Sequence, residues 1–191
     1  MDVRRYTPAD ADAVVALLEA AVGAGFAGST AADPRLSWVA HDDGLCGVAL
    51  AVVDDAPSLR RSYAEGPAFA ALERLPARGS IVRIRELAVR ADRRGRGVAS
   101  DLVARVEAAA AGLAFIHDLD TIHVLANAWL PSDPALPTSA GLFRRAGYED
   151  LGEIADFFRE FSVAAGATCP ACGPPPCRCR VRVMLKRLPA G

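Results

Sequence analysis

The sequence predicts a mixed α/β protein, in which helices cover both faces of a central sheet. Strand-like and helix-like segments alternate along the chain in the order β-α-β-β-β-α-β-α-β-β, and this alternation indicates the α/β class. The length of 191 residues is that of one domain large enough to bury its own core. Because no internal repeat or long linker divides the chain, we expect residues 1–191 to form a single domain.

The composition excludes several classes of protein. Hydrophobic residues make up 52% of the chain, yet no run of 18 apolar residues occurs, so we expect no membrane span. The N-terminal residues M-D-V-R-R-Y lack the basic and then apolar layout of a secretory signal. A net charge of −1 argues against a nucleic-acid partner recruited by overall charge. We expect a cytoplasmic protein. The sequence does not decide whether the chain forms a homodimer.

The N-terminal segments can be assigned in order. Residues 2–6 resemble a short strand, and Thr7 then caps a helix whose apolar residues recur at helical spacing until Gly23. Residues 36–53 read as a hairpin around the turn H-D-D-G. Residues 55–80 contain three prolines around one short amphipathic piece, which indicates an insertion near the surface of the domain.

A strand, a helix and a second strand follow. Residues 81–89 are apolar and β-branched enough to form a strand. The next helix carries apolar residues four apart, which form one buried stripe: Val98, Leu102, Val106 and Ala110. Residues 121–126 then predict a strand that ends at Asn127.

The C-terminal part contains a short helix and two further strands. Residues 139–146 predict the helix, which Gly147 closes. Residues 148–161 hold a strand followed by the aromatic segment D-F-F-R-E-F, and residues 179–188 alternate as a final strand does.

The stretch R-R-G-R-G-V-A lies between the strand at 81–89 and the long helix. Gly95 and Gly97 allow a left-handed backbone and bring no Cβ between the main chain and a ligand. The first N–H groups of the following helix have no partners within the helix, and the helix dipole adds positive charge there. Such a turn can bind a pyrophosphate. The alternative is a basic surface turn without a ligand.

At these residues the chain resembles the GNAT superfamily of acyl-CoA N-acyltransferases. Arg94, Gly97 and Ala99 match the fixed positions of its Arg/Gln-x-x-Gly-x-Gly/Ala signature, and A-G-L-F-R-R-A-G-Y is similar to its second motif. The resemblance covers about residues 2–161. It implies a mostly antiparallel sheet in which two parallel strands splay apart and bind coenzyme A, with acetyl-CoA as the co-substrate.

The resemblance also implies roles for particular residues. The main chain of residues 94–99 is expected to hold the pyrophosphate, and the strand at Leu87–Val89 is expected to pair with the pantetheine arm. Asn127 matches the asparagine that follows the family's second parallel strand only in part. The cofactor-binding set that the resemblance implies is Leu87, Val89, Arg94, Gly95, Arg96, Gly97, Val98, Ala99 and Asn127.

In this family an amine usually attacks the thioester directly in a ternary complex, which requires a base and a donor to the oxyanion. We choose Glu86 as the base and a main-chain N–H near Val89 as the oxyanion donor. The alternative is that Glu86 only pairs with Arg83 or Arg85 on an exposed strand face. The acceptor is a small-molecule or peptide amine that the sequence does not identify.

The general acid departs from the family pattern. A tyrosine often follows the aromatic residue of the short helix, and here that position is Arg144, while Tyr148 is expected to pack in the core. The leaving thiolate is then protonated by another group or by water, or transfer is slow or absent. The competing hypothesis is therefore a catalytically weak acyl-CoA-binding module or sensor.

A cluster of four cysteines, outside the common family pattern, precedes the last strand. The segment 169–179 contains Cys-x-x-Cys-Gly, typical of a zinc knuckle, and a less usual Cys-x-Cys. The expected metal ligands are Cys169, Cys172, Cys177 and Cys179. Four thiolates leave no open position, so this zinc would be structural. Disulfides, redox chemistry and another metal remain as alternatives, and a nucleic-acid-binding zinc ribbon has little support from the flanking residues.

Overall fold

The computed structural model describes residues 1–26, 32–55, 57–59, 63, 69–73 and 81–190. Its centre is one sheet of seven strands in the order β1-β2-β3-β4-β5-β7-β6. The strands are β1 (Asp2–Arg5), β2 (Trp38–His41), β3 (Leu45–Asp54), β4 (Ile81–Val89), β5 (Thr121–Leu130), β6 (Glu149–Ile154) and β7 (Arg180–Pro189). Only β4 and β5 run parallel, so the predicted mixed and mostly antiparallel sheet is confirmed.

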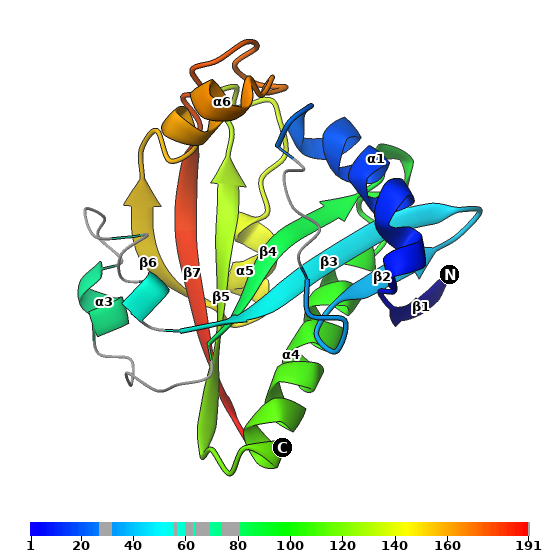
Figure 1. Cartoon of the computed structure of the whole chain (residues 1–191), viewed down its shortest axis with the longest axis vertical. Coiled ribbons are helices and arrows are strands. Elements are labelled where there is room, and N and C mark those ends of the chain that lie inside the picture. The colour runs from blue at the N-terminus through cyan, green and yellow to red at the C-terminus, as the bar shows by residue number, and fades with distance from the viewer. Residues whose placement is uncertain (27–31, 56, 60–62, 64–68, 74–80, 191) are drawn as a thin grey trace.

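Helices cover both faces of this sheet, as Figure 1 shows. The helices are α1 (Ala11–Val22), α3 (Phe69–Glu73), α4 (Val98–Ile116), α5 (Ala140–Arg145) and α6 (Arg159–Ala165). The stripe predicted for α4 is buried, and it packs with α5 into the main core on one face. Leu17 and Leu18 of α1 pack on the other face. No helix in the described residues is long and apolar enough to cross a membrane.

Strand β5 is longer than the sequence indicated. The prediction that it ends at Asn127 is wrong, because residues 128–130 continue the antiparallel ladder with β7 as far as the pair Leu130 and Arg180. Pairing with β7 keeps the backbone extended although Trp129 and Leu130 begin a segment that reads as a proline-rich loop.

Strands β4 and β5 separate partway along their length. Their pairing ends at Ile84 and Ala126, although β4 continues to Val89 and β5 to Leu130. At the same place the register of β4 with β3 shifts, so that Arg85 is an extra residue opposite Leu50 and Ala51. Such a bulge bends a strand and increases its twist. The bulge therefore accounts for the splay, which leaves one edge of β4 without a strand partner.

The predicted insertion at 55–80 is described only in part, because residues 56, 60–62, 64–68 and 74–80 lie outside the described residues. Leu59, Tyr63 and Leu72 within it are buried in a cluster with side chains of β4, β5 and β7. The described part of this segment therefore packs on the face of β4, β5 and β7 opposite the main core, and its classification as an insertion stays a prediction.

Candidate active site

A cavity of about 420 Å³ opens where β4 and β5 separate. Residues 83–87 of β4 form one wall, and Ala126, Asn127 and Trp129 of β5 form another. The remaining walls come from the end of α1, from the segment around α6, and from the beginning of α5. The splay thus produces a space between two strands that is bounded by three helices.

Glu86 lies on β4 in the wall of this cavity. Burial raises the pKa of its carboxyl group to about 7, although the positive charges of Arg85 and Arg83 oppose the rise. Arg83 is engaged elsewhere, since its Nε donates to Oδ2 of Asp54 at 2.5 Å. Among the described residues no ion pair or hydrogen bond to Glu86 is found, which disfavours the alternative of a paired surface carboxylate.

The glycine turn follows the end of β4 directly. Gly95 has φ +75° and Gly97 has φ +84°, a left-handed conformation that favours glycine at both positions. Gly97 is the N-cap of α4, a helix of 19 residues. A Cβ added at either glycine would find no heavy atom within 4 Å, so the turn faces open space. The conformation is therefore that of a turn that can bring main-chain N–H groups close to an anion.

The arginines around this turn have different partners. Arg93 lies 2.9 Å from Asp42 and 3.0 Å from Asp92, so its charge is already paired. Nε of Arg94 donates to the carbonyl of Val89 at 3.1 Å, which fixes the turn to the end of β4. Because Arg96 is exposed and has no described partner, it is the arginine best able to approach a bound phosphate.

Asn127 faces the cavity from β5, where it pairs with Val183 of β7. The buried hydroxyl of Tyr63 donates a hydrogen bond to its Oδ1 at 2.9 Å. The Asn127 amide is thus held by a residue from a segment that the sequence indicated only as an insertion.

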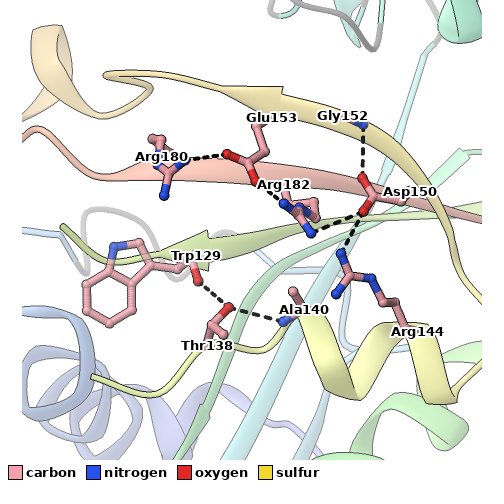
Figure 2. A network of polar contacts seen from close by, with 9 residues as sticks. All are labelled: Trp129, Thr138, Ala140, Arg144, Asp150, Gly152, Glu153, Arg180 and Arg182. Carbon is pink, nitrogen blue, oxygen red and sulfur yellow. Dashed lines mark hydrogen bonds and ion pairs between the residues drawn. The ribbon is translucent and has the colours of Figure 1, made fainter. Parts of the chain in front are cut away.

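Arg144 is not among the described residues that line the cavity; its side chain joins an ion-pair network, which Figure 2 shows. Its Nη2 lies 2.9 Å from Oδ2 of Asp150 on β6. Asp150 also contacts Arg182 of β7, which in turn pairs with Glu153. Tyr148 packs in the core, with its ring 5.0 Å from that of Phe143. Neither residue therefore offers a proton donor to the cavity, whereas the neighbouring Ser139 lines it.

The four cysteines come together in space. Their sulfur atoms all lie within 4.8 Å of one another, and three of the four side chains are buried. Three sulfur–sulfur distances are 3.6 Å for Cys169 and Cys179, 3.9 Å for Cys172 and Cys177, and 3.5 Å for Cys172 and Cys179. Gly173, with φ +77°, makes the turn that follows Cys-x-x-Cys. The group can hold one metal ion.

The cavity brings together Glu86, Leu87, Asn127, Cys169 and Cys177, all of which the sequence analysis selected. Val89 and residues 94–99 lie beyond it, at the end of β4. Sequence reasoning missed four of the aromatic side chains in the wall, which are Phe26, Phe157, Phe158 and Phe161. The run D-F-F-R-E-F was a signal for three of these, but no pattern connected it with a cavity.

The family model described as the acetyltransferase (GNAT) family matches residues 13–129, more than half of the chain. The chain belongs to this GNAT family. A comparison with curated proteins gives no match.

Solved structures of other proteins share the fold across nearly the whole chain. The GNAT-like decarboxylase GphF in complex with isobutyryl-CoA aligns with a TM-score of 0.61 at 19% identity, covering 97% of this chain and 98% of that one. Arabidopsis thaliana NAA60 with a bisubstrate analogue aligns with a TM-score of 0.60 at 15% identity, covering 100% and 99%. The ribosomal-protein-S18-alanine N-acetyltransferase of Escherichia coli aligns with a TM-score of 0.55 at 12% identity, covering 100% and 94%. At these identities the likeness shows the fold.

Proposed function

We propose that this GNAT protein is an N-acyltransferase that transfers an acetyl group, or another acyl group, from its coenzyme A thioester to a primary amine. The observation that carries the proposal is the carboxyl group of Glu86 in the cavity between the splayed strands, with a pKa of about 7. A base with a pKa near neutrality suits proton removal from an alkylammonium ion. The acceptor is a small-molecule or peptide amine.

The acyl-CoA would occupy what we name the donor end, which consists of the turn at residues 90–99 and the unpaired edge of β4. Main-chain N–H groups of residues 94–99 would hold the pyrophosphate, because they lie at the N-terminus of α4 and the space beside Gly95 and Gly97 is open. The pantetheine arm would pair with β4 beyond Ile84, where β5 no longer does.

Each residue then has one task in the transfer. Glu86 takes a proton from the ammonium group, and the neutral amine attacks the thioester carbonyl carbon to form the C–N bond. A main-chain N–H of β4 stabilises the oxyanion that develops. The C–S bond breaks as the intermediate collapses. The new amide nitrogen loses its extra proton, and the thiolate gains one, through water or through water relayed by the hydroxyl group of Ser139. Arg144 takes no part in this step.

The experiment that tests this function separates transfer from binding alone. Calorimetric titration with acetyl-CoA measures binding, and a thiol reagent then follows the release of CoA in the presence of a panel of primary amines. We expect release that depends on the amine. Tight binding of acetyl-CoA without any such release would instead establish the acyl-CoA-binding module.

The cysteine cluster is proposed to bind one structural zinc ion. Tetrahedral zinc with Zn–S bonds of about 2.3 Å places its sulfur atoms about 3.8 Å apart, close to the 3.5, 3.6 and 3.9 Å found here. The sulfur of Cys179 lies 3.6 Å from that of Cys169 and 3.5 Å from that of Cys172, and a disulfide pairing does not explain two such close neighbours. We expect purified protein to contain about one zinc per chain and cobalt-loaded protein to show the strong visible absorption of tetrahedral thiolate. Protein free of metal after purification without chelators would refute the site.

A further inference from the structure

The cysteine cluster shares a wall with the cavity. Cys169 and Cys177 line the cavity themselves. The cluster also packs against Phe26, Phe158 and Trp129, and these three side chains line the same cavity. A change in the position of the cysteines would therefore change the shape of the space beside Glu86.

The cysteine segment is tied to three separate parts of the cavity wall, which Figure 1 shows meeting at the end of the sheet where α6 lies. One hydrogen bond reaches the residues after α1, one reaches α6, and one reaches the loop that follows β5. The hydrogen bonds are Thr168 N–H to Ala24 O at 2.9 Å, Cys177 N–H to Ser162 Oγ at 2.9 Å, and Ser132 Oγ–H to Ala171 O at 3.3 Å.

Little besides the sulfur atoms fixes this segment internally. Residues 174–176 are exposed prolines, and Arg178 is exposed as well. The only isolated bridge among the described residues outside the strands is the pair of Cys169 with Gly173. In a short segment with so few backbone contacts of its own, metal binding contributes folding free energy. We therefore expect the position of this segment, and of the wall parts bonded to it, to depend on the bound ion.

The wall next to the cluster is a continuous row of aromatic rings. Ring centroids are 5.7 Å apart for Phe161 and Phe26, 5.7 Å for Phe26 and Phe158, 5.1 Å for Phe158 and Phe157, and 6.1 Å for Phe157 and Tyr63. We name this row with the cysteine cluster the acceptor end. Glu86 is the only carboxylate among the described residues that line the cavity.

We infer that the metal held by the four cysteines assembles an apolar acceptor subsite, which takes primary amines with an aromatic or aliphatic body, and that amine binding is lost without the metal while acyl-CoA binding is kept. The ammonium group would face Glu86 and the apolar body would pack on the rings. This inference rests on the proposed function, because only a transferase requires an amine to occupy this end.

The test measures amine binding to protein saturated with coenzyme A, so that no reaction takes place. Calorimetry compares 2-phenylethylamine with ethanolamine, which lacks the apolar body, on zinc-loaded protein, on chelator-treated protein and on Cys172→Ser. We expect 2-phenylethylamine to bind zinc-loaded protein about tenfold or more tightly than ethanolamine, since its ring is buried against the aromatic row. Chelation and Cys172→Ser should each remove this difference.

Two controls show whether the rest of the protein is intact. The affinity for acetyl-CoA should change less than about twofold in both zinc-free samples, because none of the described side chains packed against the cluster comes from β4 or from the turn at residues 90–99. Cys46→Ala alters a buried cysteine outside the cluster and should keep both zinc and amine binding. If Cys172→Ser fails to fold, chelator treatment and zinc re-addition to the unmodified chain give the same comparison.

The outcomes distinguish this inference from the proposed function. Equal binding of 2-phenylethylamine with and without zinc, or equal binding of the two amines, overturns the inference, as does protein that binds no metal. Zinc-dependent binding of 2-phenylethylamine without any thiol release from acetyl-CoA supports the subsite and refutes the transferase. The fluorescence of Trp129 in a Trp38→Phe background offers a readout independent of activity, because Trp129 lines the cavity and packs on the cluster.

Discussion

The donor end and the acceptor end of the cavity are built in different ways. At the donor end, Gly95 and Gly97 have left-handed backbones, and an added Cβ would meet nothing within 4 Å. At the acceptor end, aromatic rings pack against one another and against buried thiols, although Phe161 at the end of the row is exposed. A group common to all acyl-CoAs can be bound by main-chain atoms, which any sequence with suitable glycines provides. An individual acceptor requires side chains, and these are particular to this chain.

The largest effect is expected from Glu86→Gln, which removes the base between the two ends and nearly keeps the volume of the side chain. The specificity constant kcat/KM should fall about 10²- to 10⁴-fold, because a general base usually contributes a factor of that size. Steady-state assays of thiol release measure it. Acetyl-CoA should bind the variant with unchanged affinity, and a comparable loss of that affinity would assign Glu86 to the donor end.

The ionisation of Glu86 should also set the pH dependence of the reaction. Burial raises the pKa of Glu86 to about 7, and the base must be ionised to accept a proton. The kcat/KM of the native chain should therefore rise with pH and level off above about 7. Glu86→Gln should lose this inflection, whereas a profile that keeps it would show that another group is the base.

The second-largest effect is expected from Gly97→Val, which should weaken the binding of acetyl-CoA at the donor end. A valine there must adopt φ +84°, which costs about 1–2 kcal/mol, and its branched side chain covers the N–H groups at the start of α4. We expect the Kd for acetyl-CoA to rise about tenfold or more. The matched control is Gly112→Ala in the same helix, where nothing lies within 4 Å and the backbone is helical, and it should keep the affinity. Equal effects of both substitutions would refute the phosphate turn.

The sequence predicted the donor end more fully than the acceptor end for a physical reason. The glycine turn and the helix after it are local features, which appear as spacing within about ten residues. Glu86 could be chosen because it belongs to the same strand. The bulge at Arg85 has no local signature, and neither does the row of rings that joins Phe26 to Phe158 across 130 residues of chain. The cysteine cluster is the exception at the acceptor end, because its ligands are close together in the sequence.

Tyr63→Phe tests a smaller contribution, from the last ring of the aromatic row at the acceptor end. The variant keeps the ring against Phe157 but loses the hydrogen bond to Asn127. Loss of one such bond costs about 0.5–1.5 kcal/mol, so kcat/KM should fall about two- to tenfold. Asn127→Ala alone and the double variant complete a mutant cycle, and additive effects in that cycle would show that the bond plays no part in catalysis.

The smallest effect is expected from Arg144, although this position carries a tyrosine in many members of the family. Its side chain is half exposed and pairs with Asp150 on β6, in the network of Figure 2. Arg144→Ala should change the free energy of unfolding by about 0.2–1 kcal/mol, as exposed ion pairs do, and should leave kcat nearly unchanged.

Arg144→Tyr makes that test sharper, because it introduces the family's residue without its surroundings. The backbone of α5 directs this position toward β6, so a tyrosine here should not approach the thioester, and kcat should stay within about twofold of the native value. Thermal unfolding and steady-state rates measure the two effects. A rise in kcat of about tenfold would instead mean that the tyrosine hydroxyl group reaches the leaving thiolate. In that case α5 would form a third part of the site, which provides the general acid, beside the donor end and the acceptor end.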